Sequence, residues 1–384
     1  MSKAKNGSGQ ECNREQGVRI SFGLATPEDD LALRQLLQSI RMDGIISVSF
    51  RREPNYFAAH HCEGDFVQVI TARDRTSGQI VGMGSRSVRE RYVAGIPRSI
   101  GYLSGLRIHP AYRGGTMLAR GYQYLKQLDQ DQRAEFYVTT IAMENKPAAV
   151  ALLGGRAGLP SYIQIGRLNT WIIPKRKKPP KTSARCSVRP VTERELESLM
   201  SFLKQVSMTR ALLPCYQLGD FAFPSCTFEG MRRNDFQGLW MDDQLVGTLG
   251  MWDQRGMKQY VVEKYDWWLG WTRPLYNVGA ALTGRVRIPP PGASLPLVTG
   301  ALPLASEQGI EAFGDLVDAV ASGLPDNADA IMIGLCEEDP LTEVMRGRAI
   351  QKYQTGIYVV SWDGDKLPAI ARSMNLPYLE LGTL

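Results

Sequence analysis

The stretch Leu103 to Tyr124, LSGLRIHPAYRGGTMLARGYQY, joins an apolar run, a proline, a basic glycine pair and a second apolar pattern. His109-Pro110 predicts the end of a strand, because proline cannot donate to a ladder and restricts the residue before it. Apolar residues then recur at three- and four-residue spacings, at Met117, Leu118, Tyr122, Leu125 and Leu128. This spacing is typical of a helix with one apolar face, so the stretch predicts a strand, a tight turn and a helix.

The turn between these elements has the chemistry of an anion site. Gly114 and Gly115 allow the backbone to approach a ligand closely, and the first N–H groups of a helix have no internal partner. The helix dipole adds positive potential, and Arg113 adds a full charge beside it. We therefore expect a diphosphate to bind the backbone of Arg113, Gly114, Gly115, Thr116, Met117, Leu118 and Ala119. The alternative is an ordinary strand-to-helix turn with a solvated Arg113.

At these residues the chain resembles the GNAT family of acyl-CoA-dependent N-acyltransferases. The family signature is a strand, a Pro-aromatic-Arg step and a Gly-rich turn of the form (Arg/Gln)-x-x-Gly-x-(Gly/Ala) that opens a helix. The frame LRIHPAYRG with Arg113 matches it, whereas Thr116 replaces the second glycine and Leu118 stands where Gly or Ala is usual. The resemblance implies an acyl-CoA, most simply acetyl-CoA, as co-substrate.

Length and composition limit the class of protein. The 384 residues suit two domains of ordinary size. The six cysteines are scattered and only three histidines exist, so neither a disulfide framework nor a metal site is expected, and a reducing cytoplasm fits best. Adjacent residues of the cluster His60 to Glu63 would point in different directions, which argues against a shared metal ion.

With no apolar run of about twenty residues and no signal peptide, we expect no membrane partner. A net charge of +6 suits an anionic ligand without demanding nucleic acid.

The first half reads as a polar tail over residues 1–16 followed by a domain over residues 17–173. Its expected order is β-α-β-β-β-α-β-α-β, with strands near 18–24, 66–72, 79–88, 100–108, 136–142 and 162–173. The order resembles the GNAT fold, an α/β architecture with a central mixed sheet flanked by helices. Asn145 stands in an Asn-x-x-Ala step that resembles the start of the family's second conserved helix, which implies a contact to CoA; a plain helix cap is the alternative. The basic, Pro-rich residues 174–185 read as a solvated linker, or else as a nucleic-acid or membrane patch.

The second half, residues 186–384, repeats the pattern of the first. Capping signals at Thr26 and Thr192, and hairpin turns at Gly78 and Asp243, recur at nearly constant offsets. We therefore expect two tandem GNAT-like domains, with a Trp-rich insertion at about residues 251–291. The second domain has no Arg-x-x-Gly loop and should lack the CoA site. The tryptophans are expected in the core or in an interface such as that of a homodimer, with an aromatic cage for a cation as the alternative.

The resemblance also implies roles for individual residues. In the family the pantetheine arm follows the strand before the cradle, here Leu106, Arg107 and Ile108. Relatives place a glutamate on that strand as base and a tyrosine seven residues after the asparagine as acid, but this chain has Ser104 and Tyr102 on the strand and Leu152 as the later residue. Ser104 or Tyr102 can relay a proton through water. Some multidomain relatives use the terminal carboxylate as base, which suggests that role for Leu384.

These observations favour transfer of an acetyl group from acetyl-CoA to an amine of a small molecule or a protein. The rival hypothesis is an acyl-CoA-binding or interaction protein without catalysis, favoured by Thr116, Leu118 and Leu152. A third hypothesis is an aminoacyl-transferring relative whose basic linker contacts transfer RNA.

Overall fold

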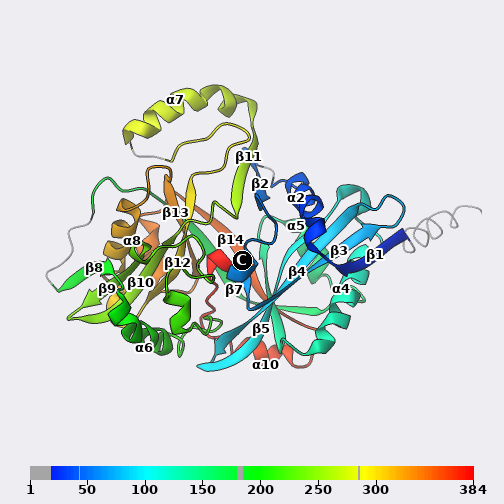
Figure 1. Ribbon diagram of the computed structural model, residues 1–384, viewed down its shortest axis with the longest axis horizontal. Helices are drawn as coiled ribbons and strands as arrows, with labels where there is room; N and C mark the ends of the chain where they lie inside the picture. The colour runs from blue at the N-terminus through cyan, green and yellow to red at the C-terminus, as the bar shows by residue number, and fades with distance from the viewer. Residues whose placement is uncertain (1–18, 43, 180–184, 284–285) are drawn as a thin grey trace, which may run out of the picture.

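A computed structural model describes residues 19–42, 44–179, 185–283 and 286–384. The tail expected over residues 1–16 and part of the expected linker, residues 180–184, lie outside this range. The described chain forms one large mixed sheet with helices on both of its faces (Figure 1). The expected fold class, two tandem GNAT-like units built on a mixed sheet, is confirmed.

The first half follows the expected order with two additions, a strand and a short helix between α2 and β3. Its strands are β1 (Ile20–Leu24), β2 (Ile46–Arg51), β3 (Phe66–Asp74), β4 (Ile80–Val93), β5 (Ile96–Ile108), β6 (Phe136–Ala142) and β7 (Ser161–Pro174). Its helices are α2 (Asp30–Ser39), α3 (His60–Glu63), α4 (Met117–Leu128) and α5 (Lys146–Leu153). Helix α4 buries Met117, Tyr122 and Leu125, as its apolar spacing predicts.

The second half repeats this succession of elements. Its strands are β8 (Cys186–Pro190), β9 (Phe236–Met241), β10 (Gln244–Trp252), β11 (Gln259–Tyr265), β12 (Leu297–Ala305), β13 (Ala330–Cys336) and β14 (Gln351–Ser361). Its helices are α6 (Leu196–Val206), α7 (Trp267–Thr283), α8 (Phe313–Ser322), α9 (Leu341–Arg346) and α10 (Leu367–Arg372). Strand β5 thus corresponds to β12, and helix α4 to α8.

The two halves exchange their last strands at the centre of the sheet. The strand order is β1-β3-β4-β5-β6-β14-β7-β13-β12-β10-β9-β8. Strand β14 of the second half pairs with β6, and β7 of the first half pairs with β13. The two exchanged strands pair with each other antiparallel from Gln351↔Ile172 to Ser361↔Ser161. Each half therefore completes the sheet of the other.

A second, two-stranded sheet also joins the halves. Strand β2 pairs antiparallel with β11, from Ile46↔Tyr265 to Arg51↔Gln259. The sequence analysis predicted neither β2 nor α3, because both are short and their partners lie about two hundred residues away. Ala59 and Cys62 of this missed segment belong to a buried core formed mainly by residues of the second half. The region between α2 and β3 therefore fastens the first half to the second.

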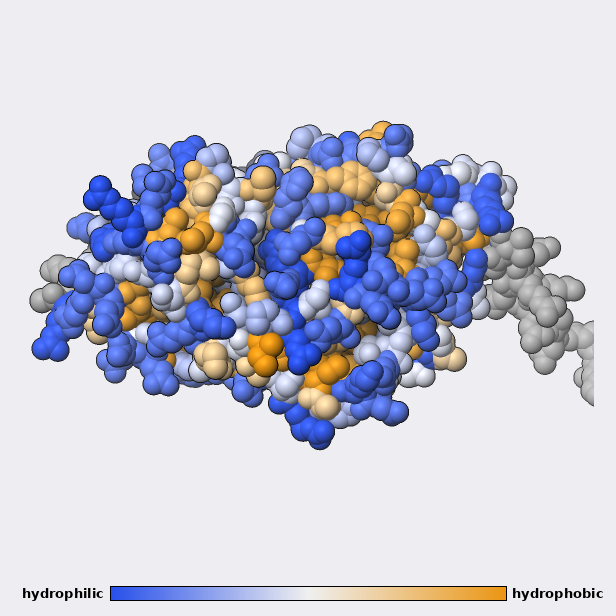
Figure 2. All heavy atoms as spheres, turned by 60° about the horizontal axis from the view of Figure 1, so that its bottom comes forward, coloured by the Kyte–Doolittle hydropathy of each residue, from blue (hydrophilic) through white to orange (hydrophobic). Residues whose placement is uncertain are grey.

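The surface is polar with separate apolar patches, as Figure 2 shows for one face. The Trp-rich segment contributes to the apolar surface rather than to the core. Trp252 is fully buried at the end of β10, but Trp267 and Trp271 on α7 are 81% and 85% exposed. The adjacent Trp268 is 46% exposed, so none of these three tryptophans lies in the core. Helix α7 projects from the body beyond β11 and has little of the molecule beside it to cover these rings (Figure 1).

Candidate active site

The turn between β5 and α4 has the backbone geometry that its sequence predicts. Gly114 and Gly115 have φ angles of +87° and +62°, in the left-handed region that favours glycine. Residues 113–116 are all exposed, and α4 begins at Met117. The first N–H groups of α4 therefore face an open turn without internal helical partners. This turn, Arg113 to Thr116 with the first residues of α4, is called the cradle below.

Hydrogen bonds and an ion pair hold the cradle in place. Arg113 donates from Nε to the carbonyl oxygen of Ile108 at 3.1 Å, which ties the turn to the end of β5. The Tyr112 hydroxyl donates to Asp74 at 2.6 Å, and Arg19 forms an ion pair with the same carboxylate at 2.7 Å. Hydrogen bonds from Arg19 and Tyr112 lower the pKa of Asp74 well below its usual range. Asp74 thus stays ionised and anchors the turn to β3.

Strand β5 bends and separates from β6 just before the cradle. The two strands pair in parallel only from Ile100↔Phe136 to Leu103↔Thr139. On its other edge, β5 pairs Ser104 with Ser85 and then Arg107 with Met83, so β5 contains one extra residue. Gly105 lies in this bulge with a φ angle of +63°. The backbone of residues 104–108 is therefore no longer paired with β6, and peptide groups become available to a ligand beside the cradle.

The structure places the predicted donor-binding residues along one continuous path. Leu106, Arg107 and Ile108 follow the bulge, and the cradle follows them directly. The Met117 side chain is buried in contact with β1, β3 and β4, so only its backbone can face a ligand. Asn145 caps α5 by accepting a hydrogen bond from the Ala148 N–H at 3.2 Å. A direct contact of Asn145 to CoA stays a prediction.

Two of the residues proposed for proton transfer, Tyr102 and Ser104, lie on β5, and Leu152 stands where relatives place a tyrosine. Tyr102 is buried and shares a 2.7 Å hydrogen bond with Thr140, and burial raises the pKa of its phenol to about 12. Ser104 is partly buried next to the bulge. Leu152 is packed in a core with Tyr122 and Leu125. Leu152, which stands where relatives place a proton-donating tyrosine, thus contributes to the hydrophobic packing of α5.

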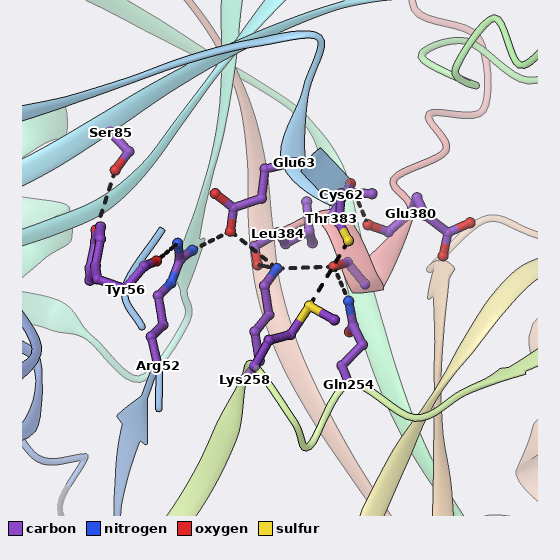
Figure 3. A network of polar contacts seen from close by, with 12 residues as sticks. Arg52, Tyr56, Cys62, Glu63, Ser85, Gln254, Lys258, Glu380, Thr383 and Leu384 are labelled. Carbon is purple, nitrogen blue, oxygen red and sulfur yellow. Dashed lines mark hydrogen bonds and ion pairs between the residues drawn. The ribbon is translucent and has the colours of Figure 1, made fainter. Parts of the chain in front are cut away.

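A buried network of charges connects the bulge on β5 to the last residue of the chain (Figure 3). It begins at Ser85, whose hydroxyl lies 3.5 Å from that of Tyr56. Arg52 donates to the Tyr56 carbonyl at 3.3 Å and forms an ion pair with Glu63. A Cβ atom on Gly105 would lie within 4 Å of both hydroxyls, so this end of the network touches the bulge.

The far end of the network belongs to the second half. Lys258 lies 3.2 Å from the Glu63 carboxylate and donates to the main-chain oxygens of Gly382 at 3.0 Å and Leu384 at 3.2 Å. Gln254 also donates to Gly382, at 2.7 Å. The side chains of Glu63 and Lys258 are 4% and 7% exposed. The network therefore crosses from one half to the other in the interior of the protein.

Burial and charge act against each other in this network. Burial would raise the pKa of Glu63, but Arg52 and Lys258 outweigh it and lower that pKa below its usual value. Burial lowers the pKa of Lys258, although Glu63 opposes the shift. Glu63 is thus an ionised carboxylate between two cations, which leaves one positive charge in excess. The Leu384 main-chain oxygen lies beside that excess charge.

Leu384 also borders a cavity between the two halves. The cavity is lined by residues of β2, β11, β12 and β13, of the loops that precede β11 and β12, and of the C-terminal segment: Phe50, Gln254, Arg255, Lys258, Tyr260, Ser294, Leu295, Leu297, Thr299, Met332, Leu381 and Leu384. Leu384 packs at the edge of the core that contains Tyr102 of β5. Figure 1 shows the chain end at the centre of the molecule, between the two halves. Leu384 therefore lies between this core and the cavity.

The equivalent position in the second half is filled by protein. Strand β12 has a register shift like that of β5, and Leu302 there has a φ angle of +51°. The Leu302 N–H donates to the buried Glu380 carboxylate at 2.9 Å, and Tyr378 donates to the same oxygen at 2.6 Å. Burial raises the pKa of Glu380. The Glu380 side chain thus accepts a hydrogen bond from the Leu302 N–H, the peptide group that corresponds to the bulge on β5.

Sequence reasoning missed the residues of the buried network. Glu63 lies in the cluster His60 to Glu63, which was considered only as a set of metal ligands, and the residues considered for proton transfer were those of β5 and Leu384. Within the described part of the chain, no group of three His, Cys, Asp or Glu side chains is arranged to hold a metal ion. The available signal was a set of charged residues, Arg52, Glu63 and Lys258, each close to apolar or aromatic neighbours in sequence.

Comparison with known proteins identifies the fold. No protein-family model matches the sequence, and no curated protein matches it significantly. Solved structures of Saccharomyces cerevisiae N-myristoyltransferase with bound myristoyl-CoA do match. One has a TM-score of 0.57 at 9% identity over 89% of this chain and 82% of that one. Another, with inhibitors also bound, has a TM-score of 0.56 at 9% identity over 89% and 80%. The molecule therefore has the GNAT fold of acyl-CoA-dependent N-acyltransferases, with two GNAT-like units in one chain.

Proposed function

We propose that this protein is an acyl-CoA-dependent N-acyltransferase whose donor binds in the first half. The observation that carries the proposal is the continuous path from the bulge at Gly105, along the unpaired end of β5, to the exposed glycine turn at the start of α4. The turn suits the diphosphate of CoA, because helix N–H groups and Arg113 offer positive potential to an anion. The unpaired peptide groups of β5 suit the amide-containing pantetheine arm.

The proposed reaction joins the donor path to the cavity beside Leu384. The amine nitrogen attacks the thioester carbonyl carbon, a peptide N–H beside the bulge stabilises the developing oxyanion, and the carbon–sulfur bond then breaks to release CoA thiolate. The attacking amine must lose a proton, and we assign it to the Leu384 carboxylate of the 384-residue chain. The proton returns to the thiolate through water, with Ser104 and Tyr102 as polar neighbours. The amide and free CoA are the products.

Lys258 and Glu63 position this carboxylate in the proposed site. Lys258 bonds the main-chain oxygens of Gly382 and Leu384 while Glu63 holds its ammonium from the first half. The excess positive charge of the network is thereby neutralised by the carboxylate. Lys258 thereby holds the chain end in one orientation, and an ionised carboxylate there can accept a proton.

A direct assay identifies which acyl group the protein transfers and which amine accepts it. The protein is incubated with acetyl-CoA, and separately with a medium-chain and a long-chain acyl-CoA, in the presence of amines and of peptides with a free N-terminus. Products are detected by mass spectrometry, and released CoA by a thiol reagent. We expect amide formation with at least one pair, reduced by about a hundredfold or more when one residue is appended after Leu384. Unreduced turnover in the extended chain would exclude the carboxylate as base.

The second candidate is a protein that binds acyl-CoA without turnover. The packing of Leu152 in the core favours it, because the site lacks a tyrosine in the position typical of the family. Saturable acyl-CoA binding together with no amide product from any pair would support this candidate over the enzyme.

A further inference from the structure

Helix α7 carries a stripe of exposed apolar side chains on an arm outside the body of the molecule. Trp267, Trp271, Leu275 and Val278 are 81%, 85%, 79% and 62% exposed. Their spacings of four, four and three residues place them on one face of the helix. Met42 and Ile45, at the entry to β2, are exposed next to it, because the Ile45 carbonyl accepts a hydrogen bond from the Asp266 N–H at 3.1 Å. These six residues are called the α7 patch.

The opposite face of the same helix is tied to the protein. Leu269 and Ala280 are buried, and Asn277 exchanges two hydrogen bonds of 2.9 Å with the backbone of Ile288. Tyr276 donates to the Val286 carbonyl at 3.3 Å. These contacts fix the orientation of α7, so the α7 patch points away from the body of the molecule.

Among the described residues around the patch, unpaired basic side chains outnumber unpaired acidic ones. The helix itself contains no acidic residue between Trp267 and Thr283 and one basic residue, Arg273. Arg41 and Lys264 are exposed where the strands β2 and β11 lead into the patch, opposed by the exposed Asp266. Among the described residues nearby, the acidic Glu263 is engaged with Arg51 at 2.7 Å. Tryptophan with leucine on one face and basic residues at its margin is the composition of helices that lie in a membrane interface.

The size of the patch argues against a second copy of the chain as its main occupant. A helix of 17 residues is about 25 Å long, and a face about 10 Å wide offers about 250 Å². A stable dimer buries about 800 Å² on each partner. A lipid surface needs no matching partner area, and the apolar rings can enter the boundary between headgroups and acyl chains.

We propose that α7 is a peripheral membrane anchor that binds the surface of bilayers containing anionic lipids, with the α7 patch inserted and Arg41 and Lys264 facing the headgroups. No described helix is long and apolar enough to span a membrane, so the anchor lies in the interface plane. The expectation of no membrane partner rested on the lack of an apolar run of about twenty residues and of a signal peptide, neither of which bears on a helix in the interface plane. The proposal is independent of the acyl-transfer chemistry, since α7 contributes no residue to the cavity or the cradle.

Vesicle flotation tests this anchor. The full chain is mixed with vesicles of phosphatidylcholine and phosphatidylserine, and compared with the variant Trp267→Ser/Trp271→Ser/Leu275→Ser. We expect the wild type to float and the variant to lose vesicle affinity by about tenfold or more. Ile96→Ser is the matched control, because Ile96 is 57% exposed at the hairpin between β4 and β5 and lies outside the patch. The control should bind as the wild type does.

Fluorescence quenching combined with urea unfolding separates a loss of vesicle binding from a loss of folding. Vesicles with brominated acyl chains should quench the fluorescence of the wild type and not that of the variant, while both proteins unfold at similar urea concentrations because the replaced side chains are exposed. Failure of the wild type to bind, or equal binding by the variant, would overturn the proposal. A wild-type dimer in sedimentation that the variant abolishes, without vesicle binding, would assign the patch to a second copy of this chain.

Discussion

Glu63 has a position that few carboxylates take, enclosed in the interior between an arginine and a lysine from different halves of the chain. A buried charge is tolerated only when partners compensate its loss of hydration. Here the compensation also orders the C-terminal segment, because Lys258 contacts both Glu63 and the last residues. Through Lys258, Glu63 thus contributes both to the stability of the protein and to the geometry of the proposed site.

Removing the charge of Glu63 should destabilise the protein strongly. Glu63→Gln leaves Arg52 and Lys258 buried without their shared counter-charge, and breaking a buried pair in this way typically costs about 3–5 kcal/mol. Urea unfolding of both proteins at pH 7 gives the difference. Glu343→Gln is the control, since Glu343 pairs with Arg346 on the surface and exposed pairs contribute below about 1 kcal/mol. Similar losses in the two variants would contradict the buried network.

His60 should make the protein less stable in mild acid. Burial lowers the pKa of His60 to about 4, whereas the unfolded chain has a pKa near 6.5. The unfolded state therefore binds more protons below pH 6.5, and stability is lost as the pH falls from there toward 4. At pH 5 the loss amounts to at most about 2 kcal/mol. His60→Phe keeps an aromatic ring beside Tyr56 and Phe57, and should show a smaller loss between pH 7 and pH 5 in urea unfolding.

The cradle is the element that the sequence predicted best, and its neighbours show why other parts were missed. The order of strand, glycine turn and helix is a local property, since Pro110, the glycine pair and the apolar spacing of α4 all act within a few residues. Strand β2 and helix α3 depend on partners in the second half, and the residues next to them in sequence do not identify those partners. The network of Glu63 was missed for the same reason. Sequence patterns report neighbours along the chain, whereas this site is assembled across the two halves.

Glycine at position 114 is required by the backbone of the cradle. Gly114→Val would force a β-branched residue into a φ angle of +87°, at a cost of about 1–2 kcal/mol, although no atom lies within 4 Å of the added Cβ. We expect the turn to relax and acyl-CoA affinity to fall by about tenfold or more. Gly347→Ala is the control, because Gly347 follows α9 with a φ angle of −87° and open space around it. Unchanged acyl-CoA affinity in Gly114→Val would show that the turn does not contact the donor.

The exchange of β7 and β14 makes the whole molecule one structural unit. We propose that residues 17–173 and 186–384 are the repeated units of the sequence, but neither holds all strands of its own sheet. Strand β14 is inserted between β6 and β7, so the first unit alone leaves two unpaired edges at its centre. Gene duplication followed by strand exchange would explain why one unit keeps an open cradle while Glu380 fills the equivalent position in the other.

Separate expression of the first unit should therefore fail to give a folded domain. A chain of residues 1–179 lacks β14 and the partner of β2, and is expected to be largely unfolded or aggregated by circular dichroism and sedimentation. The full chain should unfold in a single calorimetric transition. Adding a synthetic peptide of residues 351–361 tests the cause, since partial recovery of structure would identify β14 as the missing element. A stable, monomeric first unit would contradict this account.

The most direct test of the central claim is a calorimetric titration of acyl-CoA into the full chain and into Arg113→Glu. Acetyl-CoA and a long-chain acyl-CoA are both titrated, and Arg194→Glu serves as a matched charge reversal on an exposed residue of the second half. The account predicts one donor site per chain in the wild type and in Arg194→Glu, with affinity lowered by about tenfold or more in Arg113→Glu, because that variant places negative charge at an anion site. Equal affinity in Arg113→Glu, or two equivalent sites per chain, would contradict the assignment of the donor to the cradle of the first half.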